Sequence, residues 1–171
     1  RVCAWLAVGM LFSGAVVNGQ AERLEYRVLA TTRTATMEKE MNAAADAGFR
    51  FQAVMGGETA VGGKEVVAVF AKVSGPHDRF QYRLLATNRT SQMQRELQDA
   101  AELGYEYRGQ TVFESLFGGR EVVCILERNV DRRNAPAYQY KLLATTKTST
   151  MQKELLAAGD EGFEAVGMTI G

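Results

Sequence analysis

Short stretches in which apolar and polar residues alternate recur along the chain, and each is followed by a stretch with helical spacing. In residues 24–31 the apolar side chains occupy every second position, whereas Glu25 and Arg27 lie between them. Residues 80–84 and 138–142 alternate in the same way. A period of two predicts a half-buried β-strand in each of the three places.

The helical stretches carry apolar residues at positions i, i+4 and i+7. This spacing predicts three amphipathic helices that lie against a sheet. The stripes consist of Met37, Met41 and Ala44, then Met93, Leu97 and Ala100, then Met151, Leu155 and Ala158. Methionines at helical spacing are typical of a core, so we interpret them as packing residues and not as metal or cofactor ligands.

The ends of these helices also carry signals. Gly48, Gly104 and Gly162 follow the three stripes and suit the left-handed position that ends a helix. At the other end, the pairs Ser91 with Gln94 and Ser149 with Gln152 predict capping boxes.

Two further strands follow each of the first two helices. Residues 49–55 and 105–113 alternate, whereas residues 65–73 and 121–128 are apolar on both faces. A strand that is apolar on both faces is normally central and covered twice, which predicts the antiparallel order first, third, second. Gly62–Gly63 and Gly118–Gly119 suit tight hairpin turns, and Cys124 is expected to be a small buried hydrophobe.

The pattern is a repeat. The stretch Tyr82-Arg-Leu-Leu-Ala-Thr-Asn-Arg-Thr90 has close copies at residues 26–34 and 140–148, and the tyrosines are 56 and 58 residues apart. We therefore predict an α+β fold of tandem β-α-β-β repeats, with antiparallel sheets and helices on one face. The expected units are residues 22–74, 79–130 and 138–171, the last of them truncated. Units of about 50 residues are marginal alone, so they are expected to share a core.

The helix ends resemble an uncharacterised bacterial domain family of β-α-β-β fold, in which the helix closes with a Gly-x-x-Gly-Trp-Glu type signature. The matching segments are residues 41–50, 97–106 and 155–164. Phe or Tyr replaces the Trp, and the first Gly of the signature is present only in the third segment, as Gly159. The resemblance supports the fold and implies no catalytic residue.

Residues 1–21 differ from the repeats. Arg1 is followed by an apolar run to Val17 and then by small and polar residues. This pattern is typical of a cleaved signal peptide and indicates a secreted or periplasmic protein, with no stable membrane insertion after cleavage. The run is shorter than the roughly 20 residues that span a bilayer, so an anchor is the lesser alternative. We also expect the chain to be part of a longer product, and its source to be bacterial.

The charge balance and the numbers of histidines and cysteines argue against further classes of function. Twenty Lys and Arg balance 20 Asp and Glu, so the basic excess of a nucleic-acid binder is missing and no nucleic-acid partner is expected. His77 is the single histidine and Cys3 and Cys124 are the two cysteines, which leaves neither a zinc ligand set nor a histidine-based catalytic triad. We expect no cofactor, no metal and no catalytic residue.

Two features remain as candidate sites. A hydroxyl and a basic residue precede each helix, and a helix N-terminus can bind an anion. These residues are Arg33, Thr34, Arg89, Thr90, Lys147 and Thr148. Capping and solvation are the simpler interpretation. The second feature is the apolar back of each sheet, which includes Val67, Val69, Val123 and Ile125 and predicts contact between units, with another chain or with a protein partner.

The sequence thus favours an exported, non-enzymatic repeat protein that acts as a binding or assembly module. One alternative is a binder of small anions or acidic polymers through the three turns. The other is an enzyme whose catalytic groups lie outside these residues.

Overall fold

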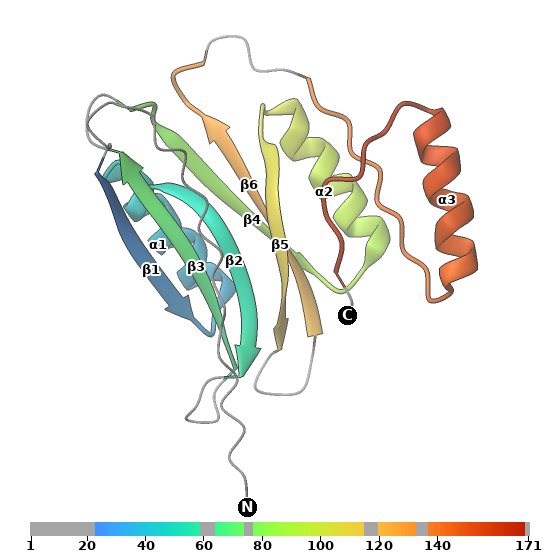
Figure 1. Ribbon diagram of the computed structural model, residues 1–171, viewed down its shortest axis with the longest axis horizontal. Helices are drawn as coiled ribbons and strands as arrows, with labels where there is room; N and C mark the ends of the chain where they lie inside the picture. The colour runs from blue at the N-terminus through green and yellow to red at the C-terminus, as the bar shows by residue number, and fades with distance from the viewer. Residues whose placement is uncertain (1–22, 59–63, 74–76, 115–119, 133–136, 170–171) are drawn as a thin grey trace, which may run out of the picture.

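The computed structural model describes residues 23–58, 64–73, 77–114, 120–132 and 137–169. Within these ranges the chain forms three helices and two three-stranded antiparallel sheets (Figure 1). The predicted α+β class is therefore confirmed. The proposed signal segment and the hairpin turns at Gly62–Gly63 and Gly118–Gly119 lie outside the described residues.

Strand order is the same in both sheets. The first sheet has the order β1-β3-β2 and the second the order β4-β6-β5, with all neighbours antiparallel. The prediction that the third strand is central is confirmed in both. The elements are β1 (Leu24–Thr31), α1 (Thr34–Asp46), β2 (Arg50–Glu58), β3 (Lys64–Val73), β4 (Phe80–Thr87), α2 (Thr90–Glu102), β5 (Glu106–Glu114), β6 (Arg120–Asn129) and α3 (Thr148–Asp160).

All three helices end in the same motif. Gly48, Gly104 and Gly162 have φ values of 85°, 80° and 89°, in the left-handed region that favours glycine. The N–H of the following residue bonds to the carbonyl four residues before that glycine, as Phe49 does to Ala44. This pairing is the Schellman motif, so the predicted glycine ends are confirmed.

The predicted capping boxes are wrong. The N-cap residues are Arg33, Arg89 and Lys147, and none of the three helices has a side-chain cap hydrogen bond. The hydroxyl that bonds near each start comes from an earlier threonine: Thr31, Thr87 and Thr145 accept from the N–H of these N-cap residues. Gln94, which the capping box would have used, binds backbone groups of a later segment instead.

Helix α1 lies between the two sheets. Its stripe of Met37 and Met41 shares one cluster with Phe70 on the first sheet and with Val123 and Ile125 on the second. The back of the second sheet is therefore covered by a helix. The contact predicted for Val123 and Ile125 with the first unit is therefore present, but it is made with α1 and not with the back of the first sheet.

Helix α2 covers the other face of the second sheet. Its Met93 and Leu97 cluster with Cys124 and Leu126 of β6, and Cys124 is buried there, as predicted. Strand β6 is thus central and covered on both faces. Strand β3 is covered by α1 on one face only, since Val67 and Val69 on its other face are half-buried.

Residues 138–142, predicted as a strand, have no strand conformation. A strand needs a neighbouring ladder, and no described strand pairs with this segment. Its backbone groups bond to side chains of α2 instead. The segment and α3 lie on the far side of α2 from the second sheet (Figure 1).

Substitution of Val123 by Asp should lower the free energy of unfolding by about 3 kcal/mol or more, because it buries an unpaired carboxylate between α1 and β6. Val28→Asp is the matched control, since Val28 also lies in a strand but is 62% exposed. The control should cost less than about 1 kcal/mol. Equal losses in urea unfolding would contradict the burial of Val123.

Candidate functional site

The first candidate site is a joint between α1 and the edge strand β4. The Asn42 side chain bonds to both backbone groups of Tyr82: its Nδ2 donates to the carbonyl and its Oδ1 accepts from the N–H, each at 2.9 Å. Glu38 Oε2 accepts from the N–H of Leu84 at 2.8 Å. Because β4 is at the edge of its sheet, these side chains satisfy backbone groups that would otherwise lack a partner.

A second joint repeats the arrangement between α2 and residues 140–142. Gln94 Nε2 donates to the Tyr140 carbonyl at 2.7 Å, and Gln94 Oε1 accepts from the N–H of Leu142 at 2.7 Å. Gln98 Oε1 accepts from the N–H of Tyr140 at 3.4 Å. Gln94 and Gln98 correspond in the sequence repeat to Glu38 and Asn42, so one helix face makes both joints.

A tyrosine hydroxyl completes each joint. The ladder of β2 shifts register between Phe51 and Ala53, and Tyr82 Oη accepts from the Phe51 N–H at 2.8 Å. The ladder of β5 shifts between Tyr107 and Gly109, and Tyr140 Oη accepts from the Tyr107 N–H at 2.7 Å. A bulge interrupts the ladder locally, and the hydroxyl occupies the site next to it.

The first joint also contains an ion pair between the buried Glu127 and Arg50, whose side chain is 44% exposed. The Glu127 side chain is 3% exposed, its Oε2 accepts from the Tyr82 hydroxyl at 2.7 Å, and its Oε1 accepts from Arg50 Nη2 at 2.8 Å. The Arg50 guanidinium lies 4.3 Å from the centre of the Phe80 ring. A two-point contact between arginine and carboxylate is among the stronger polar interactions in proteins.

The surroundings of this cluster raise the pKa values of Tyr82 and Arg50. Burial and the neighbouring Glu127 carboxylate raise the pKa of Tyr82 far above its usual range. The hydrogen bond to Glu127 raises the pKa of Arg50, which therefore stays charged. Both oxygens of Glu127 already accept hydrogen bonds, which suits a fixed structural contact more than proton transfer.

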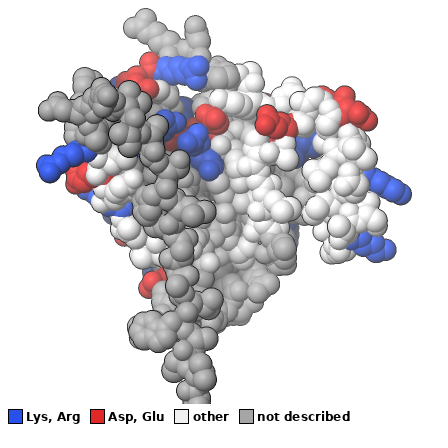
Figure 2. Space-filling view, in the orientation of Figure 1, with Lys and Arg blue, Asp and Glu red and all other residues white. Residues whose placement is uncertain are grey.

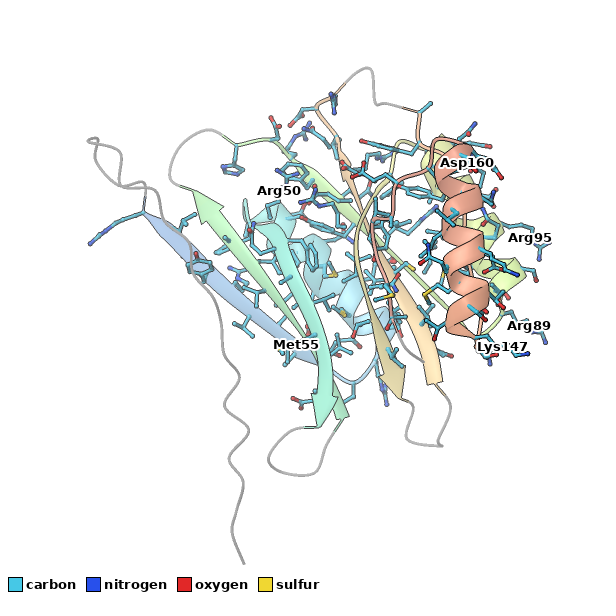
Figure 3. The ribbon with its side chains drawn as sticks, turned by 45° about the vertical axis from the view of Figure 1, so that its right-hand side comes forward. Arg50, Met55, Arg89, Arg95, Lys147 and Asp160 are labelled. Atoms are coloured by element: carbon cyan, nitrogen blue, oxygen red, sulfur yellow. The ribbon has the colours of Figure 1, made fainter. Side chains whose placement is uncertain are left out.

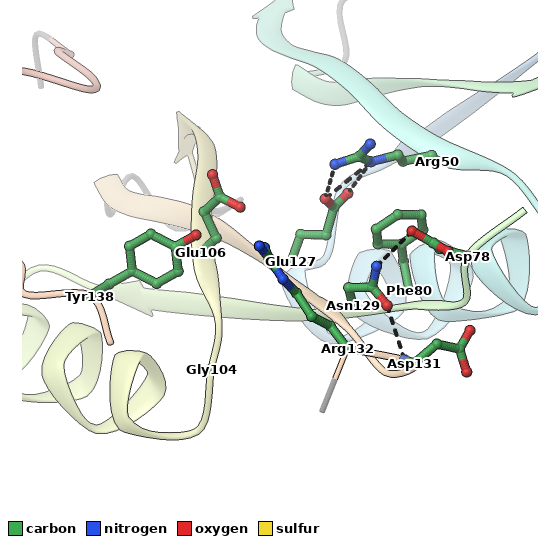
Figure 4. Close-up of a pocket in the computed structure, with 10 residues that line it drawn as sticks. All are labelled: Arg50, Asp78, Phe80, Gly104, Glu106, Glu127, Asn129, Asp131, Arg132 and Tyr138. Carbon is green, nitrogen blue, oxygen red and sulfur yellow. Dashed lines mark hydrogen bonds and ion pairs between the residues drawn. The ribbon is translucent and has the colours of Figure 1, made fainter. Parts of the chain in front are cut away.

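An open cleft of about 450 Å³ borders this ion pair (Figure 4). Glu127 and Arg50 lie on one side of it, and Glu106 and Tyr138 face them across the opening. Its lining mixes both charges: Arg50, Asp78, Phe80, Gly104, Glu106, Glu127, Asn129, Asp131, Arg132 and Tyr138. No group of three residues suited to hold a metal occurs in the part of the chain that the structure describes.

The six residues predicted as an anion site lie at the starts of the three helices. Helices α1, α2 and α3 all begin at the lower end of the molecule in Figure 1, and Arg89 and Lys147 lie at neighbouring corners in Figure 3. No hydrogen bond or ion pair connects the six to one another within the described ranges. Anion binding by Arg33, Thr34, Arg89, Thr90, Lys147 and Thr148 therefore stays a prediction.

Cys124 has no feature of a nucleophile. Its side chain is buried beneath α2, and burial raises the pKa of the thiol to about 11. Thiolate is the reactive form, so this cysteine is inert at neutral pH.

Comparison with family models, with curated proteins and with solved structures finds no match. Among the described residues, none of the helices has the length and apolar character needed to cross a bilayer. On the face shown in Figure 2, basic and acidic side chains are interspersed, and uncharged residues fill the middle.

Sequence reasoning missed the joint residues. Glu38, Asn42 and Gln94 are ordinary polar positions beside an apolar stripe, and nothing local distinguishes them from solvated side chains. One signal was available: the tyrosine that opens each repeat is preserved, although a plain core position would tolerate Phe or Leu. A preserved hydroxyl indicates a buried hydrogen-bond partner.

The same substitution at the three corresponding tyrosines should give three different results. Tyr82→Phe should lower the free energy of unfolding by about 1–3 kcal/mol, because it leaves the Phe51 N–H unpaired and removes a donor from Glu127. Tyr140→Phe should cost about 1 kcal/mol, since it removes the acceptor for the Tyr107 N–H at a less buried site. Tyr26→Phe should cost almost nothing, because Tyr26 is 53% exposed. Equal effects in chemical unfolding would contradict the role of the joint.

Stability should also fall at high pH. A tyrosine whose pKa is raised on folding contributes stability that is fully present below its unfolded pKa of about 10, and this contribution is lost as pH rises toward the folded value. The free energy of unfolding should decline above about pH 10, and Tyr82→Phe should reduce that slope. Tyr107, whose pKa burial raises to about 12, leaves part of the slope in place. An identical slope in the wild type and in Tyr82→Phe, measured from pH 8 to pH 11.5, would contradict this assignment.

Proposed function

We propose that this chain is an exported, non-enzymatic protein built from tandem β-α-β-β units, and that it acts as a binding or assembly module. One observation carries the proposal. The same joint forms twice, and each time a helix receives the first segment of the following repeat through polar side chains and a tyrosine hydroxyl. A joint that uses corresponding residues at two places is suited to adding units in a row.

The first joint supports a cooperative array more than a set of separate domains. Its cluster combines side chains of α1 with those of both sheets, so the first sheet shares its core with the second, whose other face packs on α2. Neighbouring repeats that share a core depend on one another for stability. This role is mechanical, and it requires no reactive group.

The binding surface in this proposal is the back of the first sheet. Leu24, Tyr26 and Val28 of β1 are 49%, 53% and 62% exposed, and Val67 and Val69 of β3 lie half-buried beside them. The corresponding back of the second sheet carries α1. A contiguous apolar face of this kind is typical of an interaction surface, and a protein partner or a second copy would fit it.

Neither alternative gains support from the geometry. For an enzyme, the most buried carboxylate among the described residues, Glu127, has both oxygens occupied by Arg50 and Tyr82. For an anion binder, the three helix starts have basic N-cap residues that are exposed and share no contact. The resemblance to the uncharacterised bacterial family and the export of the protein remain parts of the proposal.

Fluorescence of the apolar dye 8-anilinonaphthalene-1-sulfonate tests the binding surface, at dilutions where sedimentation shows a monomer. The wild type should enhance the dye fluorescence, and Val28→Asp should reduce it because it places a charge in the middle of the face. Val130→Asp is the matched control, since Val130 is an exposed valine outside both sheets. Equal fluorescence from Val28→Asp and from the control would contradict a binding role for this face.

A further inference from the structure

Each of the first two helices ends against a basic side chain from the central strand of its own sheet. Lys72 of β3 donates from Nζ to the Ala47 carbonyl at 2.9 Å, and Arg128 of β6 donates from Nη1 to the Leu103 carbonyl at 3.3 Å. Both carbonyls lie between the helix and the glycine with positive φ. The last carbonyls of a helix have no partner within it and form the negative end of its dipole, so a cation is favoured there.

An aromatic ring completes this contact. Phe49 follows the glycine that ends α1 and is 3% exposed, and its ring centre lies 4.1 Å from the Arg27 guanidinium and 5.6 Å from Lys72 Nζ. In the ladder Arg27 pairs with Phe70, a near neighbour of Lys72, so the two cations lie on one face of adjacent strands. A cation over an aromatic face is attracted by the ring. We call Phe49, Arg27 and Lys72 the clamp of the first repeat.

The second repeat has the same clamp. Tyr105 is 5% exposed, and its ring centre lies 5.3 Å from the Arg83 guanidinium and 5.0 Å from that of Arg128. The position of Lys72 and Arg128 is basic in both repeats, although the residue before it changes from Ala71 to Glu127. The two copies have thus diverged at the joint while their clamps keep the same charges.

The joint requires a helix rotation that an apolar stripe alone does not fix. Met37 and Met41 hold α1 on the sheets, but hydrophobic contact is non-directional, so it lets a helix roll or slide by a small amount. Asn42 has to meet both backbone groups of Tyr82 at 2.9 Å, and hydrogen bonds weaken steeply away from good geometry. A directional contact elsewhere on α1 has to set its rotation.

The clamp supplies a directional contact at the end of α1. Its bond to Ala47 follows directly on the last turn of the helix, beyond Asn42. The N–H of Phe49 bonds to the Ala44 carbonyl, which ties the ring to the same turn. Within the described ranges Lys72 has no hydrogen bond or ion pair with β4, so any effect of Lys72 on the joint passes through the first repeat.

We propose that Lys72 and Arg128 are positioning residues: each holds the end of its helix on the sheet and thereby sets the rotation at which that helix presents its polar side chains to the next repeat. Helix α1 then offers Asn42 to β4, and α2 offers Gln94 to the segment that follows β6. This inference rests on the proposed function, because it treats the joint as the contact that places one repeat on the next. It adds residues that act on the joint from outside it.

Amide hydrogen exchange, followed residue by residue by NMR, tests the proposal in the intact chain. The N–H groups of Tyr82 and Leu84 donate to side chains of α1, so their exchange rates report on the joint. Leu85 is the internal reference, because successive N–H groups of an antiparallel strand point to opposite sides and its own faces β6. Lys72→Met keeps the length of the side chain and removes its charge.

In Lys72→Met, exchange of the Tyr82 and Leu84 amides should speed up by about tenfold or more relative to the Leu85 amide, because the joint opens while the ladder of β4 stays closed. Lys72→Arg should restore the wild-type rates, since the second repeat has an arginine at this position. Lys39→Met is the matched control: it removes an exposed lysine of α1 that lies outside clamp and joint, and none of these rates should change.

The second clamp allows a crossed comparison. Arg128→Met should speed up exchange at Leu142, whose N–H donates to Gln94 of α2. Lys72→Met should leave the Leu142 amide unchanged, because each clamp acts on the joint of its own helix.

Equal acceleration of the Tyr82, Leu84 and Leu85 amides in Lys72→Met would overturn the inference, because it would show a general loss of stability. Unchanged rates, or rates that Lys72→Arg does not restore, would overturn it as well. The dye-binding test of the sheet face does not involve Lys72. Its result therefore separates a failure of the proposed function from a failure of this inference.

Discussion

An edge strand with an apolar face has to bury its side chains and also pair its outer backbone groups. In this molecule a single contact, between β4 and α1, satisfies both requirements, and the rest of the structure depends on it. Strand β4 must bury Tyr82 and Leu84, and it must also pair the backbone groups on its outer edge. Helix α1 does both, since its methionines cover the apolar side chains while Asn42 and Glu38 bond to the backbone. The two sheets share a core because the methionines of α1 pack against both of them, while Asn42 and Glu38 on the same helix bond to β4.

The Tyr82 hydroxyl connects this contact to the register shift in the neighbouring ladder of β2. Strand β2 shifts register near Phe51, which leaves an N–H turned away from the ladder, and Tyr82 reaches it from the adjacent sheet. The Tyr82 ring contributes buried area, and its hydroxyl bond to Phe51 fixes the position of β4 relative to β2. The Glu127 carboxylate accepts a hydrogen bond from this hydroxyl, and Arg50 in turn binds the carboxylate.

Local patterns predicted most of the fold and little of the joint. The strand alternation, the helical stripes, the glycine ends and the central third strand all follow from periods of two and 3.6 or from positive φ, which are properties of short segments. The roles of Asn42, Gln94 and Glu127 depend on partners at least 40 residues away, as in the bond from Asn42 to Tyr82. The strand expected at residues 138–142 does not form for a related reason. Alternation predicts which side chains share a face, but a strand also needs a neighbouring strand with which to pair.

The ion pair between Arg50 and Glu127 favours one order of the repeats along the chain. The residue that corresponds to Arg50 in the second repeat is Glu106, and the residue that corresponds to Glu127 in the first is Ala71. In a second repeat placed after another second repeat, Glu106 would take the place of Arg50 beside the Glu127 carboxylate, and Arg108, 3.7 Å from Glu127, would be the remaining cation. Glu127 is only 3% exposed, so exchanging its two-point arginine partner for a like charge should lower stability. The order in which Arg50 comes one repeat before Glu127 therefore suits this contact, and an array made of second repeats alone would lack it.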